Sequence, residues 1–372
     1  MKIQIRLIAT LLISTAILSC SQEPSSSMAP EVHDGDTILV TNENVEKFLT
    51  EVTYQEHDYS FSKLNEYPPV SPGESDTPMS FSIRWKAAPS AGDITATLTD
   101  GGWTQEFSIP KGESYLEITN LRPNATYTYD VRYVSGKQIT KGSFTTTGHL
   151  HQLNFDSEVR NARDLGGWKT KDGRTIRYRM VYRGGRLEPE TLSDEGRHNI
   201  LAEGIRAQLD LRGPSDVPAE CVLGDGDEFA FCTPHLEVSF LSLFKDYGPK
   251  VGECFEFIVN CLREGKPVYY NCSLGRDRTG SLTVILLGIL NVDEGDISKE
   301  YEVTQFAPHG WATSEGETVK LTREQTYKDG VEFLWDNYVA DGETFAQGIE
   351  KFLLSNGVSR KDIDDFRTMM LQ

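Results

Sequence analysis

The nine residues from Cys272 to Gly280 read CSLGRDRTG and could perform chemistry on a bound anion. The apolar run PVYY before the cysteine predicts a strand, and the run LTVILLGIL after the loop predicts a helix. A tight loop at a helix N-terminus points backbone N–H groups toward an anion, and the helix dipole adds to the attraction. Gly275 permits the turn, and Arg278, six residues after the cysteine, offers a planar fork for two phosphate oxygens.

The same positive field favours the thiolate form of Cys272, because nearby cations and a helix N-terminus lower the pKa of a thiol. A thiolate beneath a bound phosphate is a nucleophile for phosphoryl transfer through a phosphocysteine. The loop itself would neutralise the phosphate, so the chemistry needs no metal and no cofactor. The sequence also contains no Cys-x-x-Cys and no His-Glu-x-x-His pattern typical of zinc sites.

The elements around this loop predict an α/β domain. RAQLDLRG at 206–213 reads as a strand, VGECFEFIVNCLREG at 251–265 as an amphipathic helix, and KPVYYNC at 266–272 as a strand. Strands that alternate with helices favour a mainly parallel sheet. Sites in such sheets form at the carboxyl ends of the strands. Both the DLR sequence and the cysteine fall at such ends.

Four segments, in this order, resemble the cysteine-dependent protein tyrosine phosphatase superfamily. They are RDLGG at 163–167, YRGG at 182–185, DLR at 210–212 and the loop at 272–280. The loop is most similar to the bacterial branch that carries Cys-x-x-Gly-Lys-Asp-Arg-Thr-Gly. The resemblance covers about 152–372 and implies a phosphatase with a mainly parallel central sheet flanked by helices. Its members act on phosphotyrosine and, in some cases, on other phosphoamino acids and phosphoinositides.

The resemblance also implies roles for individual residues. Cys272 would be the nucleophile, and Arg278 would bind phosphate and stabilise the transition state. Asp277 is the favoured general acid, with Asp246 as the alternative. Thr279 would donate its hydroxyl to the sulfur or cap the helix. The predicted phosphate-binding residues are Ser273, Leu274, Gly275, Arg276, Arg278 and Thr279.

Two residues depart from the family pattern. Asn271 stands where the family usually has His before the cysteine, and Arg276 replaces the loop Lys. Four charged residues of the other matching segments are expected to brace the loop or to pair with one another rather than to do chemistry; they are Arg163, Asp164, Asp210 and Arg212. The polar segment at 306–330, with His309 and Trp311, reads as a lid over the substrate or as a surface loop.

The N-terminus reads as a targeting segment over residues 1–20. Lys2 and Arg6 precede the apolar run LIATLLISTAIL, which is short for a membrane span. The sequence ILSC that ends it resembles the lipobox of bacterial lipoproteins, which implies lipidation of Cys20. We therefore expect an exported protein, lipid-anchored to a bacterial membrane and facing the periplasm or the cell surface. An ordinary secretory signal and an uncleaved anchor are the alternatives.

Residues 21–66 are expected to form a tether with a short capped helix at 42–52. Residues 67–148 then show short alternating strands, which favour a β-sandwich. In TNLRPNATYTYDVRY, the residues Leu121, Pro123 and Tyr127 resemble the fibronectin type III pattern around the tyrosine corner. This domain is expected to be a spacer that lifts the phosphatase-like domain, 149–372, away from the membrane.

Composition limits the partners. The chain has 372 residues, with 37 Lys and Arg against 56 Asp and Glu, a formal net charge of -19. This charge disfavours nucleic acid and anionic membrane surfaces as partners. Export permits disulfides, so Cys221 and Cys232 either pair or stay free thiols.

The expected substrate is a phosphorylated protein or a small phosphorylated molecule. A phosphoinositide or inositol phosphate phosphatase is an alternative, because Arg276 beside Arg278 adds positive charge. A module that binds phosphorylated ligands without turnover is another alternative, because Asn271 replaces the His that the family usually has before the cysteine. In the last alternative the chain is a surface adhesin, and the fibronectin-like domain carries the function.

Overall fold

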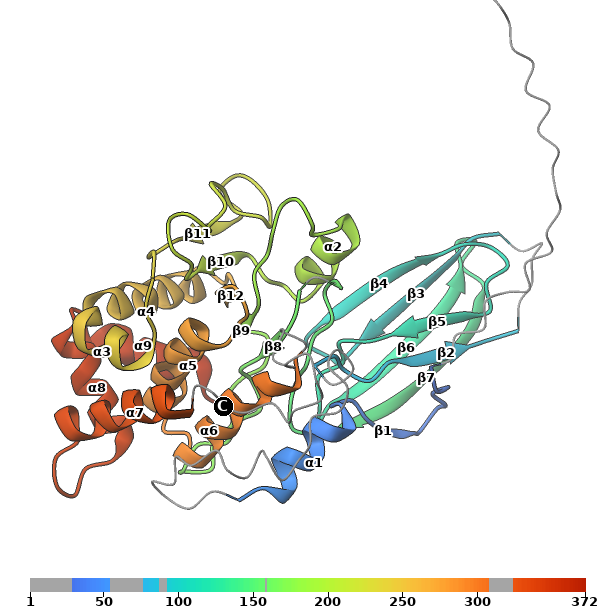
Figure 1. The fold of residues 1–372 in the computed structure, drawn as a ribbon. Coiled ribbons are helices and arrows are strands. Elements are labelled where there is room, and N and C mark those ends of the chain that lie inside the picture. Colours follow the sequence, from blue (N-terminus) through green and yellow to red (C-terminus); the bar gives the residue numbers. More distant parts are fainter. Residues whose placement is uncertain (1–28, 54–75, 87–91, 158, 308–323) are drawn as a thin grey trace, which may run out of the picture.

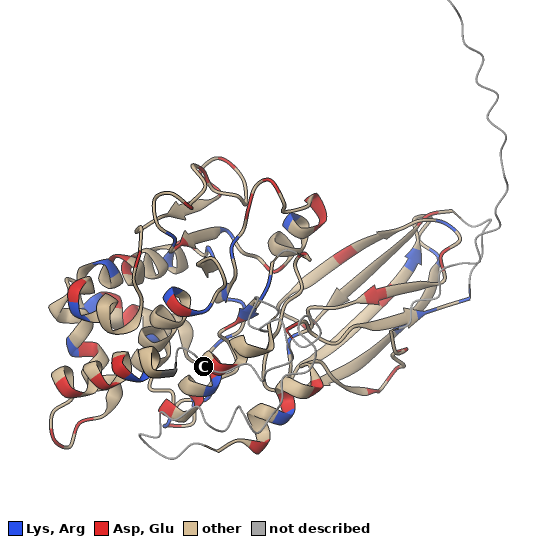
Figure 2. Cartoon of the chain, viewed as in Figure 1, with Lys and Arg blue, Asp and Glu red and all other residues tan. Residues whose placement is uncertain are grey.

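The computed structural model describes residues 29–53, 76–86, 92–157, 159–307 and 324–372 (Figure 1). Cys20 with the expected signal peptide, the start of the expected β-sandwich at 67–75, His309 and Trp311 lie outside the described residues. In the described part, no helix is long and apolar enough to cross a membrane. Figure 2 shows acidic residues on surface elements throughout the described chain, in keeping with its net charge of -19.

The N-terminal part of the described chain consists mainly of antiparallel strands. One sheet has the order β1-β7-β6-β3-β4, and β2 pairs with β5 in a second. Buried and partly or fully exposed side chains alternate along β6 (Thr126–Tyr133), as expected for a sheet with one solvated face. The other strands are β1 (Thr37–Leu39), β2 (Phe81–Arg84), β3 (Ile94–Thr99), β4 (Thr104–Ile109), β5 (Tyr115–Ile118) and β7 (Gln138–Thr147).

The described residues before 54 belong to the folded body rather than to a tether. Strand β1 is the parallel edge partner of β7. Helix α1 (Glu43–Glu51) begins after Asn42, whose side chain accepts a hydrogen bond from the Asn44 N–H at 3.0 Å. The predicted helix is therefore present, but its apolar face packs against the C-terminal part of the chain. This cluster contains Val45, Phe48, Leu49, Val52, Leu150, Val303 and Phe306.

The C-terminal part is built on a five-stranded sheet in the order β11-β10-β12-β9-β8. The four strands β9 (Val181–Gly184), β10 (Ala207–Asp210), β11 (Ala230–Cys232) and β12 (Val268–Asn271) run parallel, and β8 (Arg163–Asp164) is antiparallel to β9. The helices are α2 (Asp194–Ala202), α3 (Phe240–Asp246), α4 (Gly248–Arg263), α5 (Asp277–Ile289), α6 (Glu294–Glu302), the 3-10 helix η2 (Val303–Phe306), α7 (Glu324–Tyr338), α8 (Phe345–Ser355) and α9 (Arg360–Met370).

Both faces of this sheet are covered. Along β12, Val268 and Tyr270 point into the large cluster formed with helices α3 to α9, while Tyr269 points into a smaller cluster with α2. Because successive side chains of a strand alternate between faces, this central strand is buried along its whole length. The arrangement confirms a sheet of mainly parallel strands flanked by helices. It delivers Cys272 at the carboxyl end of β12.

A buried contact fixes the two parts of the chain to each other. The Arg179 guanidinium lies over the Trp103 ring, 4.4 Å from its centroid, and pairs with Asp100 at 2.5 Å and Glu203 at 3.1 Å. Trp103 Nε1 donates to the Ala202 carbonyl at 2.7 Å. The β-rich part is therefore docked against the sheet domain through α2 and the start of β9, which differs from a spacer joined only by a linker.

Candidate active site

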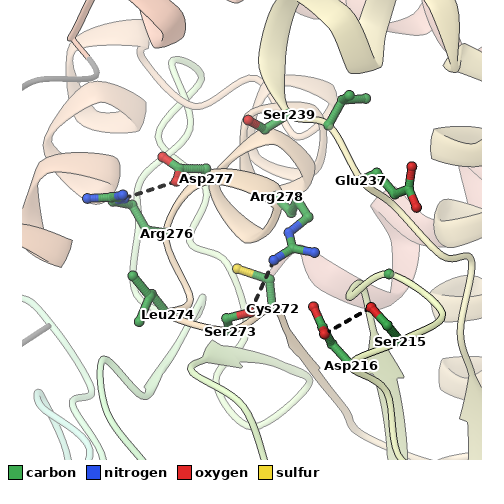
Figure 3. Close-up of a pocket in the computed structure, with 12 residues that line it drawn as sticks. Ser215, Asp216, Glu237, Ser239, Cys272, Ser273, Leu274, Arg276, Asp277 and Arg278 are labelled. Carbon is green, nitrogen blue, oxygen red and sulfur yellow. Dashed lines mark hydrogen bonds and ion pairs between the residues drawn. The ribbon is translucent and has the colours of Figure 1, made fainter.

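The loop after β12 lines a pocket of about 440 Å³ (Figure 3). The opposite side of this pocket comes from Gly213, Ser215 and Asp216 after β10 and from residues 237–239 after β11. Gly275 and Thr279 lie outside the lining. The predicted site residues that line the pocket are Cys272, Ser273, Leu274, Arg276, Asp277 and Arg278.

Three consecutive carbonyl groups of the loop are held on its outer side. The Ser273 carbonyl accepts from the Arg186 N–H at 3.3 Å. Asn161 Nδ2 donates to the carbonyls of Leu274 at 3.2 Å and Gly275 at 2.9 Å. In a trans peptide the C=O and the following N–H point in opposite directions. Carbonyls fixed outward therefore turn the next N–H groups inward, which makes the loop an anion nest.

Gly275 is required by the close approach of another backbone. Its φ is +67°, and a Cβ at this position would lie 2.4 Å from the Gly184 carbonyl carbon. A side chain would therefore push the loop off β9. The backbone that the loop approaches belongs to the two glycines of the YRGG segment, since the same Cβ would also lie 2.7 Å from the Gly185 nitrogen.

Glu300, on α6, anchors two arginines beneath the loop. Its two carboxylate oxygens accept from Arg163 Nε and Arg183 Nη1, both at 2.6 Å, and all three side chains are buried. Arg183 also donates to the Gly275 carbonyl. Burial and the nearby charge of Arg183 lower the pKa of Arg163 to about 10, so Arg163 remains protonated at neutral pH. One carboxylate thus holds two arginines behind the loop that follows β12.

The environment of Cys272 favours its thiolate. The residue is only 3% exposed, and burial alone raises the pKa of the thiol. The Thr279 hydroxyl, the charge of Arg278, and the N–H groups of Thr279 and Leu274 act against burial, and the net pKa is lowered. Thr279 Oγ1 has no regular hydrogen-bond acceptor or donor within the described residues. The hydroxyl is therefore available to donate to the thiolate, in keeping with its lowering effect on the pKa of Cys272.

The four other described cysteines have the opposite character. Burial raises the pKa of Cys221, of Cys232 to about 11, of Cys261 to about 12, and of Cys254 well above its usual value. All four are free thiols. Cys221 and Cys232, considered above as a disulfide, pack against different hydrophobic clusters. Among the five described cysteines, Cys272 is therefore the reactive one.

Arg278 is held in place over the pocket. Its Nη1 donates to the Leu236 carbonyl at 3.0 Å, and its Nη2 donates to Ser273 Oγ at 3.1 Å. Figure 3 shows the guanidinium beside the Cys272 sulfur. A planar fork fixed in this position is suited to bind two oxygens of a phosphate above the thiolate.

Asp277 has partners on both carboxylate oxygens. One accepts from Arg276 Nε at 3.1 Å and the other from the Tyr301 hydroxyl at 3.2 Å. These contacts favour a bracing role at the start of α5. The alternative acid, Asp246, is exposed at the end of α3 and does not line the pocket.

The structure adds residues that the sequence did not single out. Asp216 and Glu237 line the pocket, and Figure 3 shows them across Arg278 from Asp277. They follow the carboxyl ends of β10 and β11, so the rule that sites form at strand ends could have identified them. Asn161 and Glu300 carried no such signal, because their role depends on contacts between distant segments. Arg183 lies in the YRGG segment, but its contacts with Glu300 and the loop could not be predicted from that match.

The other charged residues of the matching segments make structural contacts. Asp164 accepts from the Arg179 N–H at 2.6 Å and the Gly166 N–H at 2.8 Å. Arg212 pairs with Asp210 at 2.8 Å. Arg163 pairs with Glu300, as described above.

Asn271 is buried directly before Cys272. Neither atom of its side-chain amide has a hydrogen-bond partner within the described residues. The main interactions that lower the pKa of Cys272 come from Thr279, Arg278 and Leu274 instead. The departure from His at this position therefore leaves those interactions in place.

Substitution of Glu300 tests the framework beneath the loop. Glu300→Gln leaves Arg163 and Arg183 without their carboxylate, so we expect affinity for orthovanadate, a phosphate-like oxyanion, to fall at least about tenfold. Isothermal titration calorimetry would measure the affinity.

Asp100→Asn is the matched control. Asp100 is a buried carboxylate that also holds two arginines, Arg122 at 2.6 Å and Arg179 at 2.5 Å, but far from the loop in the chain. Both variants should lose about 3–5 kcal/mol of unfolding free energy. Only Glu300→Gln should lose oxyanion affinity, and wild-type affinity in the folded Glu300 variant would contradict the assignment.

The lowered pKa of Cys272 gives a pH prediction. The thiolate should persist to a lower pH than in free cysteine, so the rate of iodoacetamide alkylation should reach half its maximum below about pH 8.5. Thr279→Ala should move this midpoint upward, because a group that lowers the pKa is lost. Alkylation of the Cys272→Ser variant gives the background from the other thiols. A wild-type midpoint at or above that of free cysteine would refute the account of the thiolate.

Comparison with known proteins agrees with this geometry. The sequence profile of a family described as "Tyrosine phosphatase family" matches residues 156–372. A candidate tyrosine-protein phosphatase of Cupriavidus necator is 29% identical over 173 residues, which span 41% of this chain and 62% of that relative.

Two solved structures are similar at low scores. TpbA of P. aeruginosa is 13% identical, with 51% of this chain and 96% of TpbA covered and a TM-score of 0.31. Tk-PTP in its active form is 16% identical, with 40% of this chain and 88% of that chain covered and a TM-score of 0.26. The family match, which spans more than half of the chain and includes the loop at 272–280, is decisive: the chain belongs to the tyrosine phosphatase family.

Proposed function

We propose that the chain hydrolyses phosphomonoesters through a phosphocysteine intermediate, as a protein tyrosine or dual-specificity phosphatase. The observation that carries the proposal is the placement of Cys272. It is a buried thiol with a lowered pKa, at a pocket whose lining loop has its carbonyls fixed outward and Arg278 above it. The C. necator relative is named as a tyrosine-protein phosphatase, and this name supports the same class of reaction.

The geometry suggests two steps. A substrate phosphate binds the inward N–H groups and Arg278, and the Cys272 thiolate attacks phosphorus. A sulfur–phosphorus bond forms while the bond from phosphorus to the leaving oxygen breaks, and a carboxyl group protonates that oxygen. Water then attacks the phosphocysteine, the carboxylate takes its proton, and phosphate leaves with the thiolate restored. The hydroxyl of Thr279 stabilises the sulfur as it departs. Each fixed donor to such a transition state is worth about 10²–10³ in rate.

The β-rich domain is proposed to be fibronectin type III-like. The Tyr127 hydroxyl accepts from the Arg122 N–H at 3.0 Å, which is the contact of a tyrosine corner. Its docking through Arg179 supports a role as a rigid support for the phosphatase domain. This reading disfavours an adhesin in which the phosphatase domain is incidental.

Membrane anchoring through Cys20 is also a proposal, and its basis is the ILSC sequence. Cys20→Ala should move the protein from the membrane fraction to the soluble fraction of cells that express it. Membrane association that persists in this variant would place the anchor elsewhere.

Cys272→Ser tests the nucleophile. Serine keeps the loop shape but is a much weaker nucleophile at neutral pH, so hydrolysis of p-nitrophenyl phosphate should become undetectable. Orthovanadate should still bind, which would show an intact loop. A Ser variant with wild-type turnover would rule out the cysteine mechanism. A wild-type protein that binds vanadate without turnover would instead indicate a phospho-ligand binding module.

Leaving groups of different basicity test the proton donor. A poor leaving group such as an alkoxide needs the proton far more than an activated phenolate does. Because both oxygens of Asp277 are held, we expect Asp277→Asn to slow alkyl and activated aryl phosphates by similar factors. A selective loss with alkyl phosphates would return the acid role to Asp277. Asp216→Asn, at the other side of the pocket, is then the variant in which we expect the selective loss, and Asp246→Asn is the control outside the pocket.

A further inference from the structure

A second cavity of about 260 Å³ adjoins the catalytic pocket. Glu237 and Val238 line both cavities, so they form a wall that the two share. A substrate with its phosphate at Cys272 can therefore reach the second cavity by crossing this wall. The remaining lining residues are Pro214, His235, Leu236, Tyr247 and Lys250.

The backbone that leads into the shared wall is held by hydrogen bonds from two sides, which favours a second cavity that keeps its shape without a ligand. On the catalytic side, Arg278 donates to the Leu236 carbonyl at 3.0 Å. On the other side, Lys250 Nζ donates to the carbonyls of Pro234 at 2.5 Å and His235 at 3.1 Å. A preformed cavity binds a side chain with little ordering of the protein.

The lining favours an apolar or aromatic occupant. Tyr247 is 46% exposed and is one of two large hydrophobic side chains that are exposed in the described part of the chain. Pro214, Leu236 and Val238 add apolar surface. Tyrosine is enriched at binding interfaces, because its ring offers apolar contact area while its hydroxyl stays in water.

The charges of the cavity disfavour a second phosphate. The Lys250 ammonium is already held by two carbonyls, and the Glu237 carboxylate lines the same cavity. A polyphosphorylated headgroup would bring its next phosphate against Glu237, and like charges at close range repel. A peptide, in contrast, places a neutral side chain next to its phosphorylated residue.

We propose that the second cavity is a subsite for an apolar or aromatic side chain that neighbours the phosphorylated residue of a peptide substrate. This inference rests on the proposed phosphatase function, because it takes the position of the phosphate from Cys272. It selects phosphorylated protein over inositol polyphosphate as the substrate class.

The test compares phosphopeptides that differ in one residue next to the phosphotyrosine. Each kcat/KM is divided by the value for p-nitrophenyl phosphate under the same conditions. On this scale, Leu or Phe at a flanking position should raise kcat/KM at least about tenfold over Gly, and Glu should lower it below the value for Gly. Tyr247→Ala should reduce the preference for Leu or Phe at least about threefold. Val134→Ala, which removes the other exposed large hydrophobic side chain, should keep the preference of the wild type.

Three results would overturn the subsite. They are a wild type without side-chain preference, a preference that survives Tyr247→Ala, and faster turnover of an inositol polyphosphate than of every peptide. Failure of the proposed function gives a different result, because p-nitrophenyl phosphate would then not be hydrolysed. In that case, affinities of the same peptides for the Cys272→Ser variant still decide on the subsite.

Discussion

The shape of the loop at 272–280 depends on a buried carboxylate that holds two arginines. Glu300 pairs with Arg163 and Arg183, and Arg183 together with Asn161 holds the loop carbonyls outward. The inward N–H groups, the turn at Gly275 and the position of Arg278 follow from this constraint. A buried carboxylate is costly unless it is paired, and here its pairs join β8, β9 and α6 beneath the loop.

The helix that carries Glu300 is itself held by residues outside the family match. Helix α6 carries Glu300 and continues into η2, whose Val303 and Phe306 pack against α1. Lys299, the neighbour of Glu300, donates to the Leu49 carbonyl at 3.0 Å. The segment before residue 54 therefore supports the helix that holds the loop, although the family match begins at residue 156. The contact of Arg179 with Asp100 and Trp103 fixes the β-rich part in a similar way.

The sequence was sufficient to predict the elements that depend on a local pattern of residues. The run from Pro267 to Asn271 predicts a buried strand, and CSLGRDRTG predicts a loop at a helix N-terminus, and the structure has both. The role of α1 could not be predicted, because a short amphipathic helix does not say which surface it covers. Glu300 could not be predicted either, since a Glu in a polar helix normally faces solvent. The contacts of Asp277 with Arg276 and Tyr301 likewise depend on side-chain placement, and spacing in the sequence carries no information on it.

The central claim is that phosphoryl transfer passes through the sulfur of Cys272. The most direct measurement is acid quenching of the wild-type protein during turnover of an aryl phosphate, followed by mass spectrometry of the peptide that contains residues 272–276. The account predicts one phosphoryl group on Cys272 that appears only with substrate and disappears after the substrate is exhausted. Two results would each contradict it: turnover with Cys272 unmodified at every quench time, or a phosphoryl group on another residue.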